Sequence, residues 1–171
     1  AKVYAGNARM REEVACVEFL TPEEAGTVVH LAANGKYLGY LGIEDEIKPD
    51  AKEALQALKA LGVQKNVLLT GDNARVGEAV ARRLGMDEVH AGLLPADKVS
   101  SMEALLTQGG PVMFVGDGIN DAPVIARADL GVAMGGVGSD AAIDAADIVL
   151  MDDKLSKLPR AIEIARRTMR I

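Results

Sequence analysis

The sequence has a single cysteine, no tryptophan and few aromatic residues of any kind (3%). The one cysteine, Cys16, excludes an internal disulfide and fits a reducing compartment. Because aromatic side chains are scarce, the core of this 171-residue chain must be aliphatic, and we expect its seven methionines to be packing residues rather than copper ligands. His30, His90 and Cys16 are too scattered along the chain to indicate a transition-metal site.

Long apolar runs and an excess of positive charge are also missing. No run approaches the roughly 18 apolar residues that a membrane-spanning helix needs. The first residues include Lys2, Asn7 and Arg9 with no apolar block behind them, so no signal peptide is visible. The net charge of −6 argues against a nucleic-acid-binding protein. The chain as given is therefore expected to be soluble, with no nucleic-acid partner.

The sequence does contain a hairpin signal, followed by alternating helix and strand patterns. Two β-prone runs flank Asn34-Gly35 and predict a hairpin over about 28–42. From Pro49 onward, apolar residues recur at helical spacing in some segments and form short continuous runs in others. The predicted helices lie at about 48–62, 73–85, 95–110, 120–128, 139–147 and 155–170, and the predicted strands at 66–70, 87–92, 111–116, 129–135 and 148–151.

Short strands that are apolar on both faces and alternate with helices are typical of a parallel sheet covered on two sides. The predicted class is therefore α/β, with a β-rich N-terminal part. In such sheets, ligands bind beyond the carboxyl ends of the strands. The polar glycine turns Thr70–Asn73 and Gly116–Asp121 fall at two of those ends, and they form the predicted site.

The second of these turns, "GDGIND", places Asp117 and Asp121 four residues apart beside an apolar strand. Unpaired carboxylates are costly in such a place, so a cation is expected there. Thr70 can offer a hydroxyl and backbone N–H groups to an oxyanion, and Lys98 lies in the first turns of the helix that begins near Pro95. A hydroxyl, a lysine and hard carboxylate ligands are the groups that hold a phosphoryl group together with Mg²⁺. A lone Gly-Asp-Gly could be an ordinary turn, but these residues in this order favour the site.

Three motifs make this interpretation specific: "TGDN" (70–73), Lys98 in "LLPADK", and "GDGINDAPVIARADLGVAMG" (116–135). They resemble three of the four motifs of the haloacid-dehalogenase-like fold. Their sequences are similar to the form found in the phosphorylation domain of P-type cation-transporting ATPases. The resemblance spans about Gly39 to Ile171. It implies a Rossmannoid parallel sheet flanked by helices, with Mg²⁺ and ATP as cofactors.

The resemblance also implies a role for each candidate residue. Thr70 and Gly71 would hold the phosphoryl oxygens, and Lys98 would neutralise them. Asp117 and Asp121 would form the magnesium site.

Four further residues are assigned less directly. Asn120 would help to shape the magnesium site. Asp72 either belongs to the catalytic site or caps the helix that begins near Ala74, and both interpretations stay open. "VYAGNARM" resembles the end of the small nucleotide-binding domain of these pumps, where a Gly-Asn pair, here Gly6-Asn7, contributes to the ATP site; an ordinary turn is the alternative for this pair.

Within the P-type ATPases, "AGLLPADKV" and "SDAAIDAADIVLM" are most similar to zinc, cadmium and lead exporters, and copper pumps are also similar. We predict that residues 1–42 are the C-terminal remnant of the nucleotide-binding domain, together with a hairpin that leads back to the phosphorylation domain. Residues 43–171 would be the phosphorylation domain. The resemblance implies a cytoplasmic part of an integral membrane protein, whose partners are the remaining nucleotide, actuator and membrane domains, with the transported heavy metal bound only in the parent.

The first motif of the fold, Asp-Lys-Thr-Gly-Thr in these pumps, is absent from the sequence. That motif supplies the aspartate that becomes phosphorylated, so the isolated chain is expected to be inactive. The last predicted helix is basic, with Arg160, Arg166, Arg167 and Arg170. A basic stretch of this kind is expected just cytoplasmic of a membrane span.

Two alternatives to a pump fragment remain open at the level of sequence. One is a free-standing phosphatase of the same fold, with a nucleophile drawn from Glu44, Asp45 or Glu46. The other is a non-catalytic module that binds magnesium or nucleotide and regulates a pump.

Overall fold

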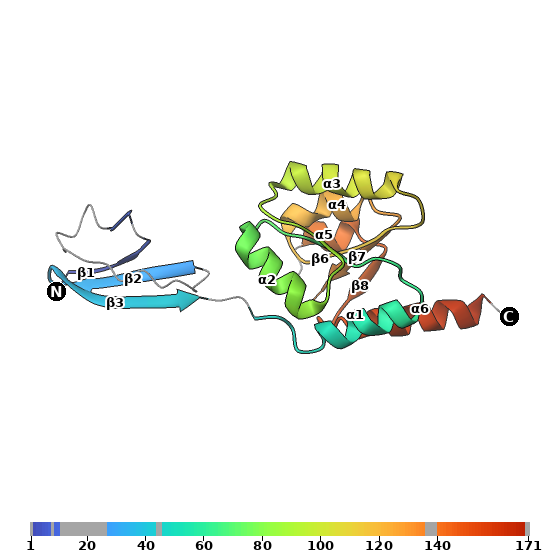
Figure 1. Cartoon of the computed structure of the whole chain (residues 1–171), viewed down its shortest axis with the longest axis horizontal. Helices are drawn as coiled ribbons and strands as arrows, with labels where there is room; N and C mark the ends of the chain where they lie inside the picture. The colour runs from blue at the N-terminus through green and yellow to red at the C-terminus, as the bar shows by residue number, and fades with distance from the viewer. Residues whose placement is uncertain (1, 8, 11–26, 44–45, 136–139, 170–171) are drawn as a thin grey trace. The chain divides into compact units, whose positions relative to one another are not determined.

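The computed structural model describes residues 2–7, 9–10, 27–43, 46–135 and 140–169 (Figure 1). Several sequence predictions lie outside these residues, namely those on Cys16, Glu44, Asp45 and Arg170. The chain divides into two compact units, Ala1–Ile47 and Lys48–Ile171, which are described separately below. The assignment of residues 1–42 and 43–171 to a nucleotide-binding and a phosphorylation domain remains a prediction.

The first unit contains a three-stranded antiparallel sheet in the order β1-β2-β3. Its strands are β1 (Val3–Gly6), β2 (Thr27–Ala33) and β3 (Lys36–Ile43). Asn34 and Gly35 connect β2 to β3 with φ angles of 50° and 76°, which is the left-handed backbone that a tight two-residue hairpin turn requires. The predicted hairpin is therefore confirmed.

The second unit alternates short strands with helices, as the sequence predicts. In chain order its elements are α1 (Ala51–Ala60), β4 (Val67–Leu69), α2 (Ala74–Leu84), β5 (Glu88–His90), α3 (Pro95–Thr107), β6 (Met113–Gly116), the 3₁₀ turn η2 (Ile119–Asp121), α4 (Ala122–Ile125), β7 (Leu130–Met134), α5 (Asp140–Ala145), β8 (Ile148–Leu150) and α6 (Lys157–Thr168). Every strand pair in this unit is parallel.

The parallel strands form two groups rather than one continuous sheet. β4 pairs with β5, and β6, β7 and β8 form a separate three-stranded sheet in that order. Within the described residues, no backbone ladder joins β4 to β6. Among the described residues, β4 and β6 therefore each have one edge without a strand partner.

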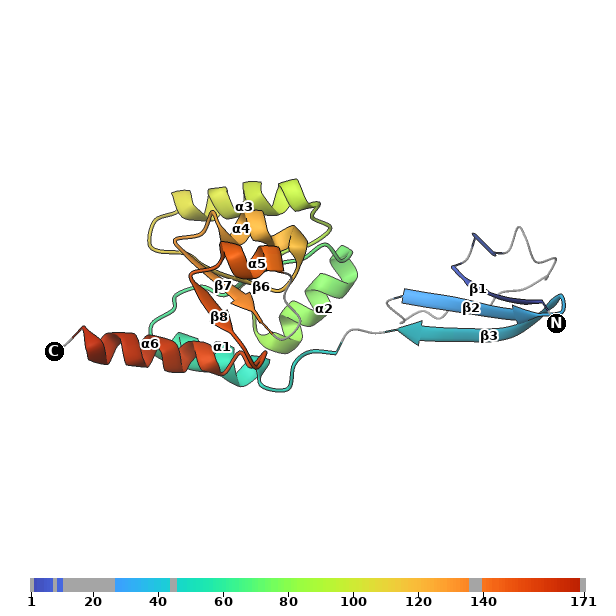
Figure 2. The ribbon, with the colours of Figure 1, turned by 180° about the vertical axis from the view of Figure 1, so that it is seen from behind.

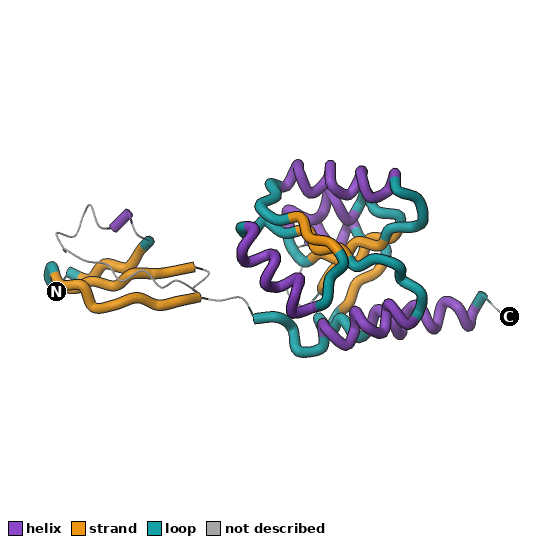
Figure 3. Tube along the Cα trace, viewed as in Figure 1, coloured by secondary structure: helices purple, strands orange, loops and turns teal. Residues whose placement is uncertain are grey.

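Two helix layers cover the larger sheet, and β7 shows how. On one face, Val132 and Met134 of β7 pack with Leu58 of α1 and Leu158 of α6. On the other face, Ala133 packs with Ile125 of α4 and with residues of α5. Successive strand residues point to opposite faces, so β7 serves both layers. Figures 1 and 2 show the same arrangement from front and back, and Figure 3 shows the strands between the helices. The core is aliphatic, as the composition predicts.

Polar contacts also join α1 and α6 at their ends. The Asp50 carboxylate accepts a hydrogen bond from the Ser156 backbone N–H (2.9 Å), and this bond holds the pKa of Asp50 below its usual value. The Arg166 guanidinium donates to the Leu61 carbonyl oxygen (2.6 Å). The two helices therefore run side by side in the same direction.

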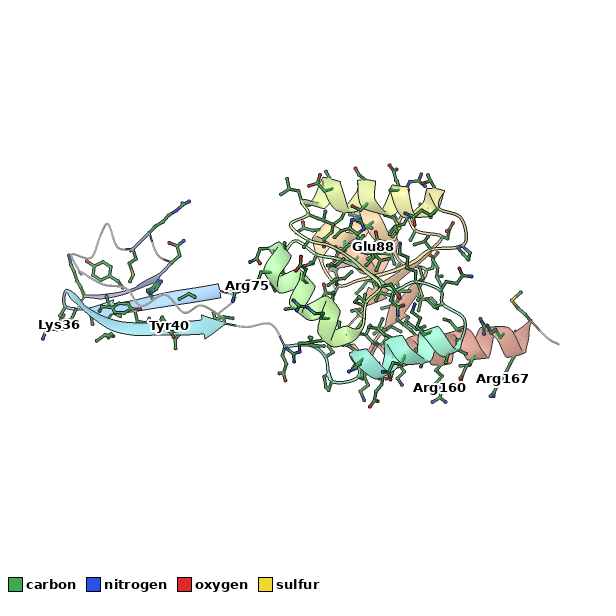
Figure 4. All side chains as sticks on the ribbon, viewed as in Figure 1. Lys36, Tyr40, Arg75, Glu88, Arg160 and Arg167 are labelled. Atoms are coloured by element: carbon green, nitrogen blue, oxygen red, sulfur yellow. The ribbon has the colours of Figure 1, made fainter. Side chains whose placement is uncertain are left out.

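α6 carries the basic stretch noted in the sequence. The side chains of Arg160 and Arg167 are exposed on this helix (Figure 4). Among the helices of the described residues, none is long and apolar enough to cross a membrane.

Candidate functional site

The predicted turns follow the carboxyl ends of strands in both groups. Thr70–Asn73 comes directly after β4, and the turn that begins at Asp117 comes directly after β6. Lys98, on the helix that follows β5, donates from Nζ to Oδ1 of Asp121 at 2.7 Å. This contact shows that the carboxyl ends of β5 and β6 open toward the same site.

The Lys98–Asp121 ion pair is the most buried of the ion pairs among the described residues. The two side chains are 17% and 11% exposed, whereas the side chains of the other pairs are 31% exposed or more. The attraction between two opposite charges in so little water is largely offset by their lost hydration, but removing one leaves the other costly to bury. The Lys98 ammonium thus fixes the position of the Asp121 side chain at the end of β6.

Glycine at position 116 lets Asp121 reach this place. A Cβ on Gly116 would lie 2.8 Å from the Cβ of Asp121, closer than real Cβ atoms come. The Asp121 backbone N–H donates to the Gly118 carbonyl oxygen (3.0 Å), which closes the turn over the strand end. Asp117 and Asn120, in the same turn, are exposed. Asp121 is therefore the inner carboxylate of the turn, and Asp117 is the outer one.

The turn after β4 is held by hydrogen bonds at Thr70. Its backbone N–H donates to the His90 carbonyl oxygen (2.9 Å), and its carbonyl oxygen accepts from the Leu93 N–H (3.1 Å). Its hydroxyl donates to the Asp72 carboxylate (2.8 Å) and accepts from the Asp72 N–H (3.1 Å). The hydroxyl is therefore oriented at the strand end before any ligand arrives, and Gly71 beside it is exposed.

The helix after this turn is capped by Asn73 and not by Asp72. The side chain of Asn73 accepts from the Val76 N–H (3.1 Å), while the Asp72 carboxylate is taken by Thr70. Of the two interpretations of Asp72, helix capping is therefore wrong. Asn73 has the extended backbone that an N-cap residue adopts, and Asp72 lies one residue too early to reach the first turn.

Replacing this cap should cost stability. Asn73→Ala leaves an N–H of the first turn of α2 without a side-chain acceptor, so we expect the free energy of unfolding to fall by about 1 kcal/mol. Urea unfolding followed by circular dichroism measures this change. Asp72→Ala is the matched control and should change stability less. A larger loss for Asp72→Ala than for Asn73→Ala would contradict the cap assignment.

Gly77 is a residue near the site that the sequence analysis did not single out. A Cβ on Gly77, in α2, would lie 2.9 Å from the Cβ of Ala91 and 3.1 Å from Cγ2 of Thr70. Glycine therefore allows α2 to pack closely against the turn that carries Thr70. The available signal was a glycine inside a helical pattern, which often has a packing reason.

The remaining candidates do not add ligands to this site. Within the described residues, no group of three or more His, Cys, Asp or Glu side chains could hold a metal ion. His90 Nε2 lies 2.6 Å from a Glu88 oxygen, and Glu88, whose pKa is lowered chiefly by Lys65, sits in β5. His30 lies in the first unit with its Nδ1 3.0 Å from the Tyr37 hydroxyl oxygen.

Gly6, predicted with Asn7 to contact ATP, is the last residue of the edge strand β1, and Asn7 follows it. Gly6 pairs with His30 in the sheet, and the Asn7 side chain accepts from the Arg9 N–H (3.0 Å). This geometry is a local turn, so ATP contact remains a prediction. Glu46, the described member of the alternative nucleophile group, lies outside every strand and helix.

Parallel strands with helices on both faces, and a lysine–carboxylate pair beyond their carboxyl ends, are consistent with one class of hydrolase. The chain belongs to the haloacid dehalogenase-like hydrolases, whose family model matches residues 1–129. The predicted fold class is confirmed.

More specifically, the chain is similar to heavy-metal-transporting P-type ATPases. It is 53% identical to a cadmium, zinc and cobalt-transporting ATPase of Bacillus subtilis and 54% identical to a zinc-transporting ATPase of Synechocystis sp.. Each match covers 99% of this chain and 24% of the relative. A crystal structure of a zinc-transporting PIB-type ATPase in the E2.Pi state matches 98% of this chain and 27% of its own, with 40% identity and a TM-score of 0.75. The chain thus spans about a quarter of the length of these relatives, and the predicted resemblance is confirmed.

Proposed function

We propose that this chain is the main part of the phosphorylation domain of a heavy-metal-exporting P-type ATPase, joined to a remnant of its nucleotide-binding domain. In the full protein, ATP phosphorylates an aspartate that lies outside this sequence, and hydrolysis of the aspartyl phosphate drives export of the cation. The domain works on the cytoplasmic side of the membrane, together with the remaining nucleotide, actuator and membrane domains. ATP contacts Gly6 and Asn7.

The arrangement of Thr70, Lys98 and Asp121 carries this proposal. Lys98 and Asp121 come from elements distant in sequence and meet in one ion pair. Thr70 follows β4, whose neighbour β5 leads into the helix that carries Lys98. The Thr70 hydroxyl, once it turns from Asp72, and the Gly71 N–H hold phosphoryl oxygens, and Lys98 neutralises their charge. Positioned donors and positive charge around the phosphoryl oxygens are the main requirement of phosphoryl transfer.

The chemistry of the donor set fits magnesium. Asp117 and Asp121 offer hard carboxylate oxygens on a glycine-rich turn, and Asn120 lies beside them. Mg²⁺ is usually bound by one or two carboxylates and completes its shell with water and phosphate oxygens. When bound, it neutralises charge on the phosphoryl oxygens. Two carboxylates from this chain are therefore enough for its share of the site.

The split between the two strand groups supports a nucleophile from outside the chain. We place the missing strand between β4 and β6, where each has an edge without a strand partner among the described residues. A strand parallel to both would join the groups into one sheet. Its carboxyl end would then lie between Thr70 and Asp117, where an aspartate could attack the phosphoryl group.

Complementation tests this proposal. Incubated with radiolabelled ATP and Mg²⁺, the 171-residue chain alone should form no hydroxylamine-labile phosphoprotein. A second polypeptide that carries the Asp-Lys-Thr-Gly-Thr strand and the preceding nucleotide-binding segment should restore labelling, on that polypeptide. The same polypeptide with Asn in place of its motif Asp is the control and should stay unlabelled. Labelling of the chain by itself would contradict the proposal, because it would place the nucleophile inside this sequence.

A further inference from the structure

The Lys98 ammonium already stands where a cation is expected. Its Nζ is 2.7 Å from Oδ1 of Asp121, the inner carboxylate of the magnesium site proposed above. Within the described part of the chain, Asp117 has no ion pair of its own. One of the two carboxylates is thus neutralised by the protein itself, and the other is not.

The same lysine has a second anionic partner in the proposed function. A single ammonium group cannot neutralise both Asp121 and a phosphoryl group fully, so the two compete for it. A divalent cation bound at Asp121 would remove that competition, because it takes over the carboxylate charge. Binding of the metal and binding of the phosphoryl group are then linked through one side chain.

We propose that Lys98 is an internal counter-cation, which neutralises Asp121 in the metal-free site and turns to the phosphoryl group when Mg²⁺ binds. This inference rests on the proposed function. It makes Lys98 a competitor of Mg²⁺ for Asp121 and a source of positive coupling between Mg²⁺ and phosphate. Such coupling is reciprocal, so each ligand raises the affinity for the other by the same factor.

A purely structural role for Lys98 predicts the opposite sign. If the lysine only ties α3 to the turn after β6, its removal loosens Asp121 and weakens Mg²⁺ binding. If it is a counter-cation, its removal leaves Asp121 with an uncompensated charge and strengthens Mg²⁺ binding. The direction of the change in Mg²⁺ affinity therefore separates the two roles.

The experiment is a titration of the 171-residue chain with Mg²⁺ alone, at constant ionic strength, followed by the NMR shifts of the Gly116–Asp121 amides. Lys98→Gln and Lys98→Met should bind Mg²⁺ about five- to thirtyfold more tightly than the original chain. Lys98→Gln keeps a hydrogen-bond donor and guards against loss of the fold, which the amide spectrum reports directly. Lys59→Met is the matched control, because it removes a 2.7 Å Lys–Asp pair, with Asp87, away from the site. Its Mg²⁺ affinity should equal that of the original chain.

Asp117→Asn distinguishes the ways in which the experiment can fail. We expect this variant to lose Mg²⁺ binding. Mg²⁺ affinity that is unchanged in Asp117→Asn would overturn the magnesium site and with it this part of the proposed function. Weakened binding in Asp117→Asn, together with unchanged or weaker binding in both Lys98 variants, would overturn the counter-cation role alone.

Discussion

Asp117→Asn in the full-length protein should lower Mg²⁺-dependent ATP turnover by at least about a thousandfold. The substitution keeps the size and shape of the side chain but removes the outer carboxylate of the proposed magnesium site. Without the metal, the only cation that the described part of this chain leaves for the phosphoryl oxygens in the proposed site is Lys98, for which Asp121 competes. Because Asp117 is exposed, the fold should survive. Phosphate release from purified protein in detergent, with circular dichroism of the same samples, measures both effects.

Asp152→Asn is the control for this experiment. Asp152 also follows the carboxyl end of a strand, β8, but it is exposed and pairs with Lys157 at 3.5 Å rather than with a group of the proposed site. Its turnover should match that of the unsubstituted protein. Near-normal turnover of Asp117→Asn, with the Mg²⁺ requirement intact, would refute the assignment of Asp117.

Gly131→Ala should have the largest effect on folding. Gly131 lies buried in β7, the central strand of the larger sheet. A Cβ there would lie 2.6 Å from the Ile125 carbonyl oxygen and 2.7 Å from Ile125 Cγ2. The carbonyl belongs to the end of α4 and cannot swing away as a flexible side chain could. We expect the free energy of unfolding to fall by about 3 kcal/mol, the upper end of overpacking costs.

Urea unfolding of the chain measures this loss, and Gly118→Ala provides the comparison. A Cβ on Gly118 would meet only ordinary contacts, the nearest at 3.7 Å from an Asp121 oxygen. Its stability should change by less than about 1 kcal/mol. Equal stability of Gly131→Ala and the original chain would mean that α4 and β7 are packed less tightly than the structure shows.

The elements of the fold were predictable where local signals are strong. Asn34-Gly35 has the backbone preference that its hairpin turn needs, and the helix over 51–60 follows from apolar residues at helical spacing. The grouping of the strands was not predictable. Hydrogen bonding between strands depends on which strands become neighbours, and no local pattern shows that β4 and β6 lack a ladder to each other.

The sequence predicts which side chains belong to the candidate site, but not which residues they pair with. Thr70 and Asp121 are predictable from their side-chain types and their place after apolar runs, and Lys98 from its place in the first turns of a helix. The sequence leaves Asp72 open between a helix cap and a site residue, because Asp is a good cap; the structure gives the cap to Asn73, whose extended backbone fits an N-cap. The close packing of Gly77 against Thr70 gave no decisive signal, since a glycine in a helix is also tolerated without a packing reason.

Taken by itself, the sequence determined the α/β class, the aliphatic core, the resemblance to heavy-metal pumps and the set of chemical groups at the site. These follow from side-chain type, apolar period and turn preference, all of which act over a few residues. Only the tertiary structure decided that Lys98 pairs with Asp121, 23 residues away, that Thr70 holds Asp72, and that Gly131 has no room for a side chain. Those contacts exist because packing brings distant segments to within a few ångströms, and local preferences carry no information about that distance.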